Sequence, residues 1–131
     1  DQTIADFVNL ERYTGPQSLV LIHDCMPLDE ETSSRVRHTA FYSGDSWKVL
    51  VFLKRCRPHL RVAVIPTMPT GLAVVSGFGR PAAGHMDATA VISEILPLTW
   101  SYFQENVSEL FERIPNERAA VRRYLAEVNA R

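Results

Sequence analysis

Two short apolar segments joined by a brief connection constrain the fold of this chain more than any other feature. Residues 61–65 (RVAVI) and 72–76 (LAVVS) have the length and the branched side chains of β-strands. Only residues 66–71 (PTMPTG) connect them, whereas a parallel pair needs a crossover of about a dozen residues or more. The sequence therefore predicts that these two strands are antiparallel neighbours in a sheet.

Segments with helical periodicity alternate with strand-like segments in the first half of the chain. Residues 3–13 place apolar side chains at helical spacing, and residues 47–56 predict a helix buried over most of its circumference. Asp45 is expected to cap this second helix. Residues 18–22 (SLVLI) are apolar without alternation, which favours a strand covered on both faces, as in a parallel sheet. The order helix, strand, helix, strand, strand predicts an α/β fold.

The rest of the chain predicts helices. Residues 77–84 are rich in glycine and proline and predict a linker. Residues 87–113 carry apolar side chains at helical spacing, with a kink or break at Pro97, and residues 116–130 predict a last helix. We expect residues 79–131 to form a helical tail that can serve as an association element.

Composition excludes several classes of protein. The 14 basic and 15 acidic residues give a net charge of −1, which offers no bulk attraction to nucleic acid or to an anionic membrane. No apolar run approaches the roughly 18–20 residues of a membrane-spanning helix, and two cysteines are too few for a disulfide framework. We expect a cytoplasmic protein. Because the chain starts without Met and inside an apparent helix, we also expect a fragment whose preceding part is absent.

His23 and Asp24 are candidate catalytic residues because they directly follow the first apolar strand. Ligands of open α/β sheets bind beyond the carboxyl ends of parallel strands. His23 can act as a general base near neutral pH, and Asp24 can orient it, bind substrate or hold a divalent cation. A purely structural alternative is equally open, in which Asp24 caps the following turn and His23 packs at the strand end.

Asp45, Trp47 and Lys48 are candidate substrate-binding residues at the start of the second helix. A lysine in a first helical turn opposes the helix dipole by a few tenths to about 1 kcal/mol, so Lys48 is predicted to reach for an anion. Trp47 can wall a pocket, and residues 28–44 predict a mobile loop beside it. In the structural alternative, Asp45 caps the helix, Trp47 is core and Lys48 is solvated or paired with an acid.

Cys25 suggests a nucleophile paired with His23. Catalytic Cys and His partners usually come from separate segments, however, and these two are close in sequence. The two cysteines and four histidines also lack the spacing of zinc ligands. A hydrolase that uses His23 or Cys25 remains a third alternative.

Three motifs follow one another along the chain: residues 19–27 (LVLIHDCMP), 43–48 (SGDSWK) and 71–75 (GLAVV). Together they resemble the carboxyl-terminal half of class I S-adenosylmethionine-dependent methyltransferases. In the most similar group, an apolar strand ends in hydrophobic-His-Asp-Cys-x-Pro and a later helix opens with Gly-Asp-x-Trp-Lys. The resemblance covers residues 1–78, and residues 79–131 match nothing known to us.

This resemblance implies the carboxyl-terminal part of a Rossmann-like sheet of seven strands, in which the last strand is antiparallel and inserted beside the fifth. Residues 18–23 correspond to the fifth strand, and residues 61–65 and 72–76 to the sixth and seventh. The family binds its cofactor with a glycine-rich turn after the first strand and an acidic residue that ends the second, and both belong to earlier strands that this chain is expected to lack. No cofactor-binding residue is therefore assigned.

The resemblance further implies transfer of a methyl group from S-adenosylmethionine to the hydroxyl of a small molecule. His23 is then the base and Asp24 a possible Mg²⁺ ligand, while Asp45, Trp47 and Lys48 lie on the rim of the acceptor site. The alternative is a non-catalytic α/β association module derived from this fold. Half a sheet has an unpaired strand edge that must be covered or paired, and the tail can cover it or form a homodimer interface.

Overall fold

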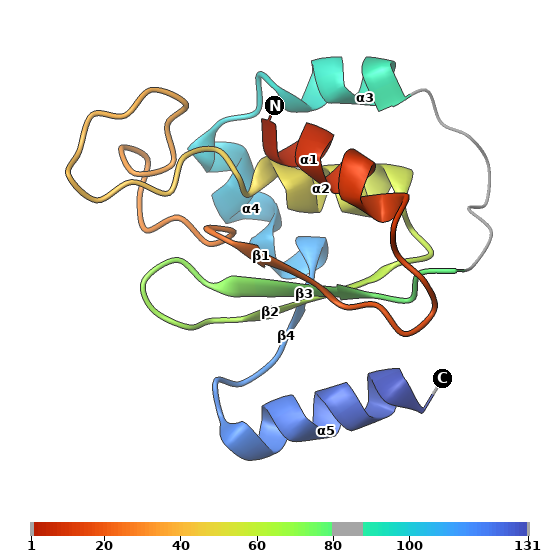
Figure 1. Ribbon diagram of the computed structural model, residues 1–131. Coiled ribbons are helices and arrows are strands. Elements are labelled where there is room, and N and C mark those ends of the chain that lie inside the picture. The colour runs from red at the N-terminus through yellow and green to blue at the C-terminus, as the bar shows by residue number, and fades with distance from the viewer. Residues whose placement is uncertain (1, 80–87, 131) are drawn as a thin grey trace.

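The computed structural model describes residues 2–79 and 88–130 and has an α/β architecture (Figure 1). Its elements are α1 (Gln2–Glu11), β1 (Val20–His23), α2 (Lys48–Cys56), β2 (Arg61–Ile65), β3 (Leu72–Ser76), α3 (Ala88–Ile95), α4 (Trp100–Leu110), β4 (Glu112–Arg113) and α5 (Arg118–Asn129). The predicted α/β class is confirmed. The predicted linker falls largely on residues 80–84, which lie outside the described residues.

The strands form a mixed four-stranded sheet in the order β1-β3-β2-β4. β3 is antiparallel to both β1 and β2, and its Leu72 lies opposite both His23 and Ile65. The predicted antiparallel pairing of the segments 61–65 and 72–76 is thus confirmed. Because β3 separates them, β1 and β2 run in the same direction without touching. β4 pairs with β2 in parallel and was not predicted, since its two residues are polar and exposed.

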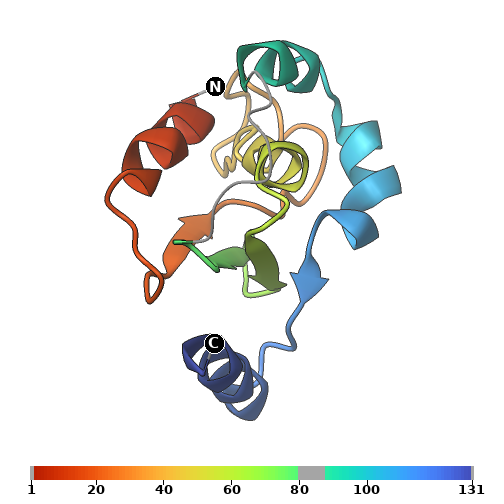
Figure 2. The same cartoon turned by 90° about the vertical axis from the view of Figure 1, so that its right-hand side faces the viewer.

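Helices α1 to α4 lie on one side of the sheet and α5 lies on the other (Figures 1 and 2). Seven of the nine residues of α2 are buried, which confirms the prediction of a helix enclosed on most sides. The main core lies between this helix and the sheet, and it draws on both halves of the chain. Its members include Ile4, Phe7, Val20, Ile22, Leu50, Phe52, Leu53, Val64, Val75, Phe78, Val91, Ile95, Phe103 and Leu110.

The tail belongs to this arrangement through its apolar side chains. α3 and α4 are separate helices around Pro97, so the predicted break is confirmed. Their apolar residues pack in the main core, and α5 packs in a second core against β2 and β3. None of the helices in the described part of the chain has the length and hydrophobicity needed to cross a lipid bilayer.

The prediction that β1 is covered on both faces is wrong. Val20 and Ile22 are buried, whereas Leu21 between them is 60% exposed. The second core contains strand residues of β2 and β3 only, so α5 leaves the same face of β1 uncovered. In the described sheet β1 is also an edge strand, and its side away from β3 is unpaired.

Phe52→Ala tests the central role of α2. Phe52 is fully buried, so its truncation is expected to lower the free energy of unfolding by about 3–5 kcal/mol, through lost apolar contact and a cavity. Phe41→Ala is the matched control, because Phe41 is 40% exposed and should cost less than about 1 kcal/mol. Urea unfolding followed by circular dichroism measures both, and equal losses would contradict the assigned core.

Candidate functional site

His23 and Asp24 lie together at the carboxyl end of β1. His23 follows buried Ile22, so its side chain takes the opposite, open face of the strand. Its Nδ1 lies 3.0 Å from Oδ1 of Asp24, and the two side chains are 57% and 36% exposed. The structure thus brings together the two predicted catalytic residues and leaves both accessible.

Thr70 fixes Asp24 from the connection between β2 and β3. It is fully buried, and its Oγ1 donates a hydrogen bond of 2.5 Å to Oδ1 of Asp24. The backbone N–H of Met26 donates to the carbonyl of Thr70 at 2.7 Å, which joins the segment after β1 to this connection. Asp24 itself has a φ of +61°, a left-handed conformation that a short polar residue tolerates. Sequence reasoning missed Thr70, because nothing local marks it as a partner of a residue 46 positions away.

This geometry leaves one imidazole nitrogen available for chemistry. When the neutral ring carries its hydrogen on Nδ1, the nitrogen near Asp24, its lone pair is on Nε2. The hydrogen bond from Thr70 holds the Asp24 carboxylate in place. His23 can therefore accept a proton from a nearby hydroxyl, provided that an acceptor molecule docks beside β1.

Asp45 does not cap α2, contrary to the prediction. The helix begins at Lys48 after a turn at residues 44–47, and no side chain caps its N-terminus. The backbone N–H of Lys48 bonds to the carbonyl of Asp45 rather than to its carboxylate. The extra turn moves the helix start past the position that the sequence favoured.

Lys48 is held inside the protein. Its ammonium donates to the carbonyl of Leu96 at 2.6 Å and lies 3.3 Å from Oδ2 of Asp45. The side chains of Lys48 and Asp45 are only 7% and 17% exposed. The anion that Lys48 contacts is thus the carboxylate of Asp45 in the same chain. The hydrogen bond from Lys48 to Leu96 ties α2 to the connection between α3 and α4. Burying the ammonium is tolerable because both partners compensate its lost hydration.

Trp47 is a core residue, 1% exposed. Its ring packs 5.2 Å from that of Phe103 and 6.5 Å from that of Tyr102, measured between centroids. In the described part of the chain, no hydrogen bond or ion pair joins Asp45, Trp47 or Lys48 to His23 or Asp24. Trp47 and Lys48 therefore match the structural alternative, whereas the helix cap it assigned to Asp45 is absent, and substrate binding by the three residues stays a prediction.

Metal binding at Asp24 also stays a prediction. Among the described residues, no three His, Cys, Asp or Glu side chains are grouped so that they could hold a metal ion. Asp24 has a histidine nitrogen and a threonine hydroxyl beside it. Mg²⁺ prefers several oxygen ligands including water, so Asp24 could supply one ligand of an ion that an acceptor molecule also contacts.

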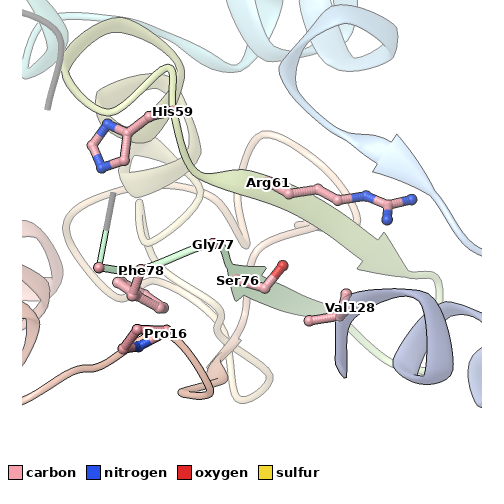
Figure 3. A pocket seen from close by; sticks show the side chains of 8 residues that line it. Pro16, His59, Arg61, Ser76, Gly77, Phe78 and Val128 are labelled. Carbon is pink, nitrogen blue, oxygen red and sulfur yellow. The ribbon is translucent and has the colours of Figure 1, made fainter. Parts of the chain in front are cut away.

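A separate hollow of about 180 Å³ lies at the other end of the sheet (Figure 3). Its lining comprises Pro16, His59, Arg61, Ser76, Gly77, Phe78, Gly79 and Val128. Sequence analysis assigned no site here and predicted only a linker for residues 77–84. The residues converge from three distant parts of the chain, and no local pattern in the sequence announces them.

The two cysteines are buried free thiols. Burial raises the pKa of the Cys25 thiol to about 12, and burial also raises the pKa of Cys56. A thiol acts as a nucleophile in its thiolate form, which Cys25 scarcely populates near neutral pH. The geometry therefore gives no support to a cysteine-dependent hydrolase.

Comparisons with models of known protein families, with curated proteins and with solved structures found no match to this chain.

The state of the thiols is directly testable. In the folded protein at pH 8, Cys25 and Cys56 are expected to react with a disulfide reagent such as dithionitrobenzoate far more slowly than free cysteine does, because both are buried and have raised pKa values. In urea both should react at the rate of an unfolded peptide. Fast labelling of Cys25 in the native protein, identified by mass spectrometry, would contradict this picture.

Proposed function

We propose that this chain is the substrate-side part of a class I S-adenosylmethionine-dependent methyltransferase that transfers a methyl group to the hydroxyl of a small molecule. The strand order β1-β3-β2, with β3 antiparallel to both neighbours, is the observation that carries the proposal. It agrees with the order fifth, seventh, sixth that the motif resemblance implies. Neither the length of the connections nor the apolar patterns of the strands required β3 to insert beside β1.

The open side of β1 also supports the proposal. Its backbone edge away from β3 is unpaired in the described sheet, and Leu21 is exposed on the face that α5 leaves free. Exposed, apolar strand edges are normally paired or covered in native proteins. In the proposed enzyme the earlier strands of the sheet, which bring the glycine-rich turn, pair with this edge. S-adenosylmethionine then binds mainly to that other part of the domain.

The protein's own task in such a reaction is to align the acceptor and remove its proton. The methyl group of S-adenosylmethionine is already activated by the positive sulfonium, so positioning and proton removal dominate. Nε2 of His23 accepts the proton of the acceptor hydroxyl, while Asp24 lies beside Nδ1 and is itself held by Thr70. Asp24 is also the position proposed for a Mg²⁺ ion.

We propose an acceptor with an apolar body. Leu28 and Met68 are exposed apolar residues on the two segments that the hydrogen bond from Met26 to Thr70 joins, and Thr70 also bonds to Asp24. Lys48 is already bound to Asp45 and Leu96, so it is not free to bind an acidic acceptor. A neutral phenol or aliphatic alcohol is the proposed class.

The open edge of β1 equally favours a second candidate, a non-catalytic association module. In that case two chains pair through β1, and the apolar side chains Leu19 and Leu21 become buried between them. Light scattering at increasing protein concentration separates the candidates. A dimer that Leu21→Lys dissociates favours the association module, whereas a monomer that binds a glycine-rich partner domain favours the methyltransferase.

His23→Gln tests the proposed base, in a polypeptide that joins this chain to the glycine-rich part of the domain. Loss of general-base catalysis is expected to lower kcat by about 10²- to 10⁴-fold with little change in KM for the acceptor. The measurement is transfer of a labelled methyl group from S-adenosylmethionine to a phenol. His38→Gln is the control, because His38 is exposed in the long loop and should leave kcat unchanged. Equal rates for the two variants would rule out His23 as the base.

A further inference from the structure

The hollow of about 180 Å³ and the His23 site lie at opposite ends of β3. Leu72, the first residue of β3, lies opposite His23, whereas Ser76, its last residue, lies opposite Arg61. Ser76 and Arg61 both line the hollow. Any ligand bound there is therefore separate from the proposed methyl acceptor.

Two residues that line this hollow have a buried polar atom that makes no hydrogen bond with the described residues. The atoms are Nδ1 of His59 and Nη1 of Arg61. The hydroxyl of Tyr124 lies outside the lining and beside Ser76, whose side chain counteracts the rise in the Tyr124 pKa that burial causes. Buried polar groups without a hydrogen bond are rare in folded proteins, so two at one hollow indicate a ligand or water as their partner.

The guanidinium of Arg61 makes close hydrogen bonds on one edge and a longer ion pair on the other. Nε and Nη2 donate to the carboxylate of Glu112 at 2.7–2.9 Å, and the group lies 4.5 Å from the ring centre of Tyr124. Nη1 is paired with Oε2 of Glu127 at 3.5 Å, a distance at which no hydrogen bond forms in the described structure. Arg61 is therefore fixed in place, and a ligand at Nη1 competes with Glu127.

The lining of the hollow favours an acceptor of hydrogen bonds with negative charge. It contains no acidic residue, and Arg61 is its one permanently charged member, with the carboxylates of Glu112 and Glu127 beside Arg61 but outside the lining. Ser76 offers a hydroxyl and His59 a ring nitrogen. In Figure 3 the side chain of Ser76 lies beside that of Arg61, and His59 lies away from both. Each water molecule occupies about 30 Å³ in the liquid. The hollow of about 180 Å³ therefore has room for a carboxylate or phosphate group with a few waters.

We propose that this hollow binds a small oxyanion group, a carboxylate or a phosphate, through Nη1 of Arg61 and the hydroxyl of Ser76. The arrangement resembles a guanidinium shared between two carboxylates, where Glu112 holds one edge and the ligand takes the other. Glu127 is the internal competitor for Nη1, because its carboxylate forms an ion pair with that nitrogen at 3.5 Å. The site is independent of the proposed methyl transfer.

Glu127→Gln gives the sharpest test, because it removes the competitor without touching the hollow. We expect it to tighten oxyanion binding about two- to fivefold, the range set by an exposed ion pair. Glu117→Gln is the matched control, since it removes the same charge from the N-terminal boundary of the same helix at a residue that does not line the hollow. Nuclear magnetic resonance titrations with sodium phosphate and, separately, sodium acetate, at constant ionic strength kept with chloride, measure the affinities.

The largest changes in backbone amide chemical shift should occur at Ser76, Gly77 and Arg61. The anion that binds with the higher affinity identifies the preferred group. Ser76→Ala should weaken binding at least threefold, and its thermal unfolding is measured to show that it folds. Substitution of Arg61 is avoided because it would also release Glu112 and the ring of Tyr124. Equal gains in Glu127→Gln and Glu117→Gln, shifts scattered over the surface, or a hollow that holds only water at high anion concentration would each overturn the proposal.

Discussion

The placement of β3 between β1 and β2 is the constraint on which the rest of the structure depends. It satisfies the backbone hydrogen bonds of β3 on both sides and makes β1 and β2 parallel at a distance. Its two ends also organise both sites. The residues before β3 supply Thr70 to Asp24, and the residue that ends β3, Ser76, meets Arg61 across the sheet. A change in register would therefore disturb the His23 pair and the hollow together.

Buried and half-buried charges join segments that are far apart in sequence. Lys48 ties α2 to the carbonyl of Leu96, and Arg61 ties β2 to Glu112 of β4 and to α5. Each cation sits near a polar partner that offsets its desolvation, and removal of one partner would leave a poorly hydrated charge. These contacts, together with two apolar cores, hold the tail on both sides of the sheet. The tail is thus an integral cover of the sheet, and any association role would use its outer faces.

Predictions from the sequence succeeded where a short stretch of chain contains its own constraint. The six residues between β2 and β3 forced antiparallel pairing, the dense apolar run of α2 forced burial, and Pro97 forced a break. Predictions failed where the outcome depends on which distant element packs against the segment. Leu21 is apolar, yet nothing in its neighbourhood says whether a helix reaches it, and α5 does not. Likewise the helix after Asp45 begins at Lys48, two residues later than a cap at Asp45 would place it.

The sequence by itself determined the α/β class, the alternation of elements and the position of an imidazole and a carboxylate at a strand end, because periodicity and connection length act locally. Only the tertiary structure decided that Thr70 fixes Asp24, that Lys48 pairs with Asp45 inside the protein and that Arg61 borders a polar hollow. The physical reason is that these contacts join residues 46 to 51 positions apart or bring an ammonium out of water. Their energies depend on burial and on distant partners, which exist only once the chain has folded.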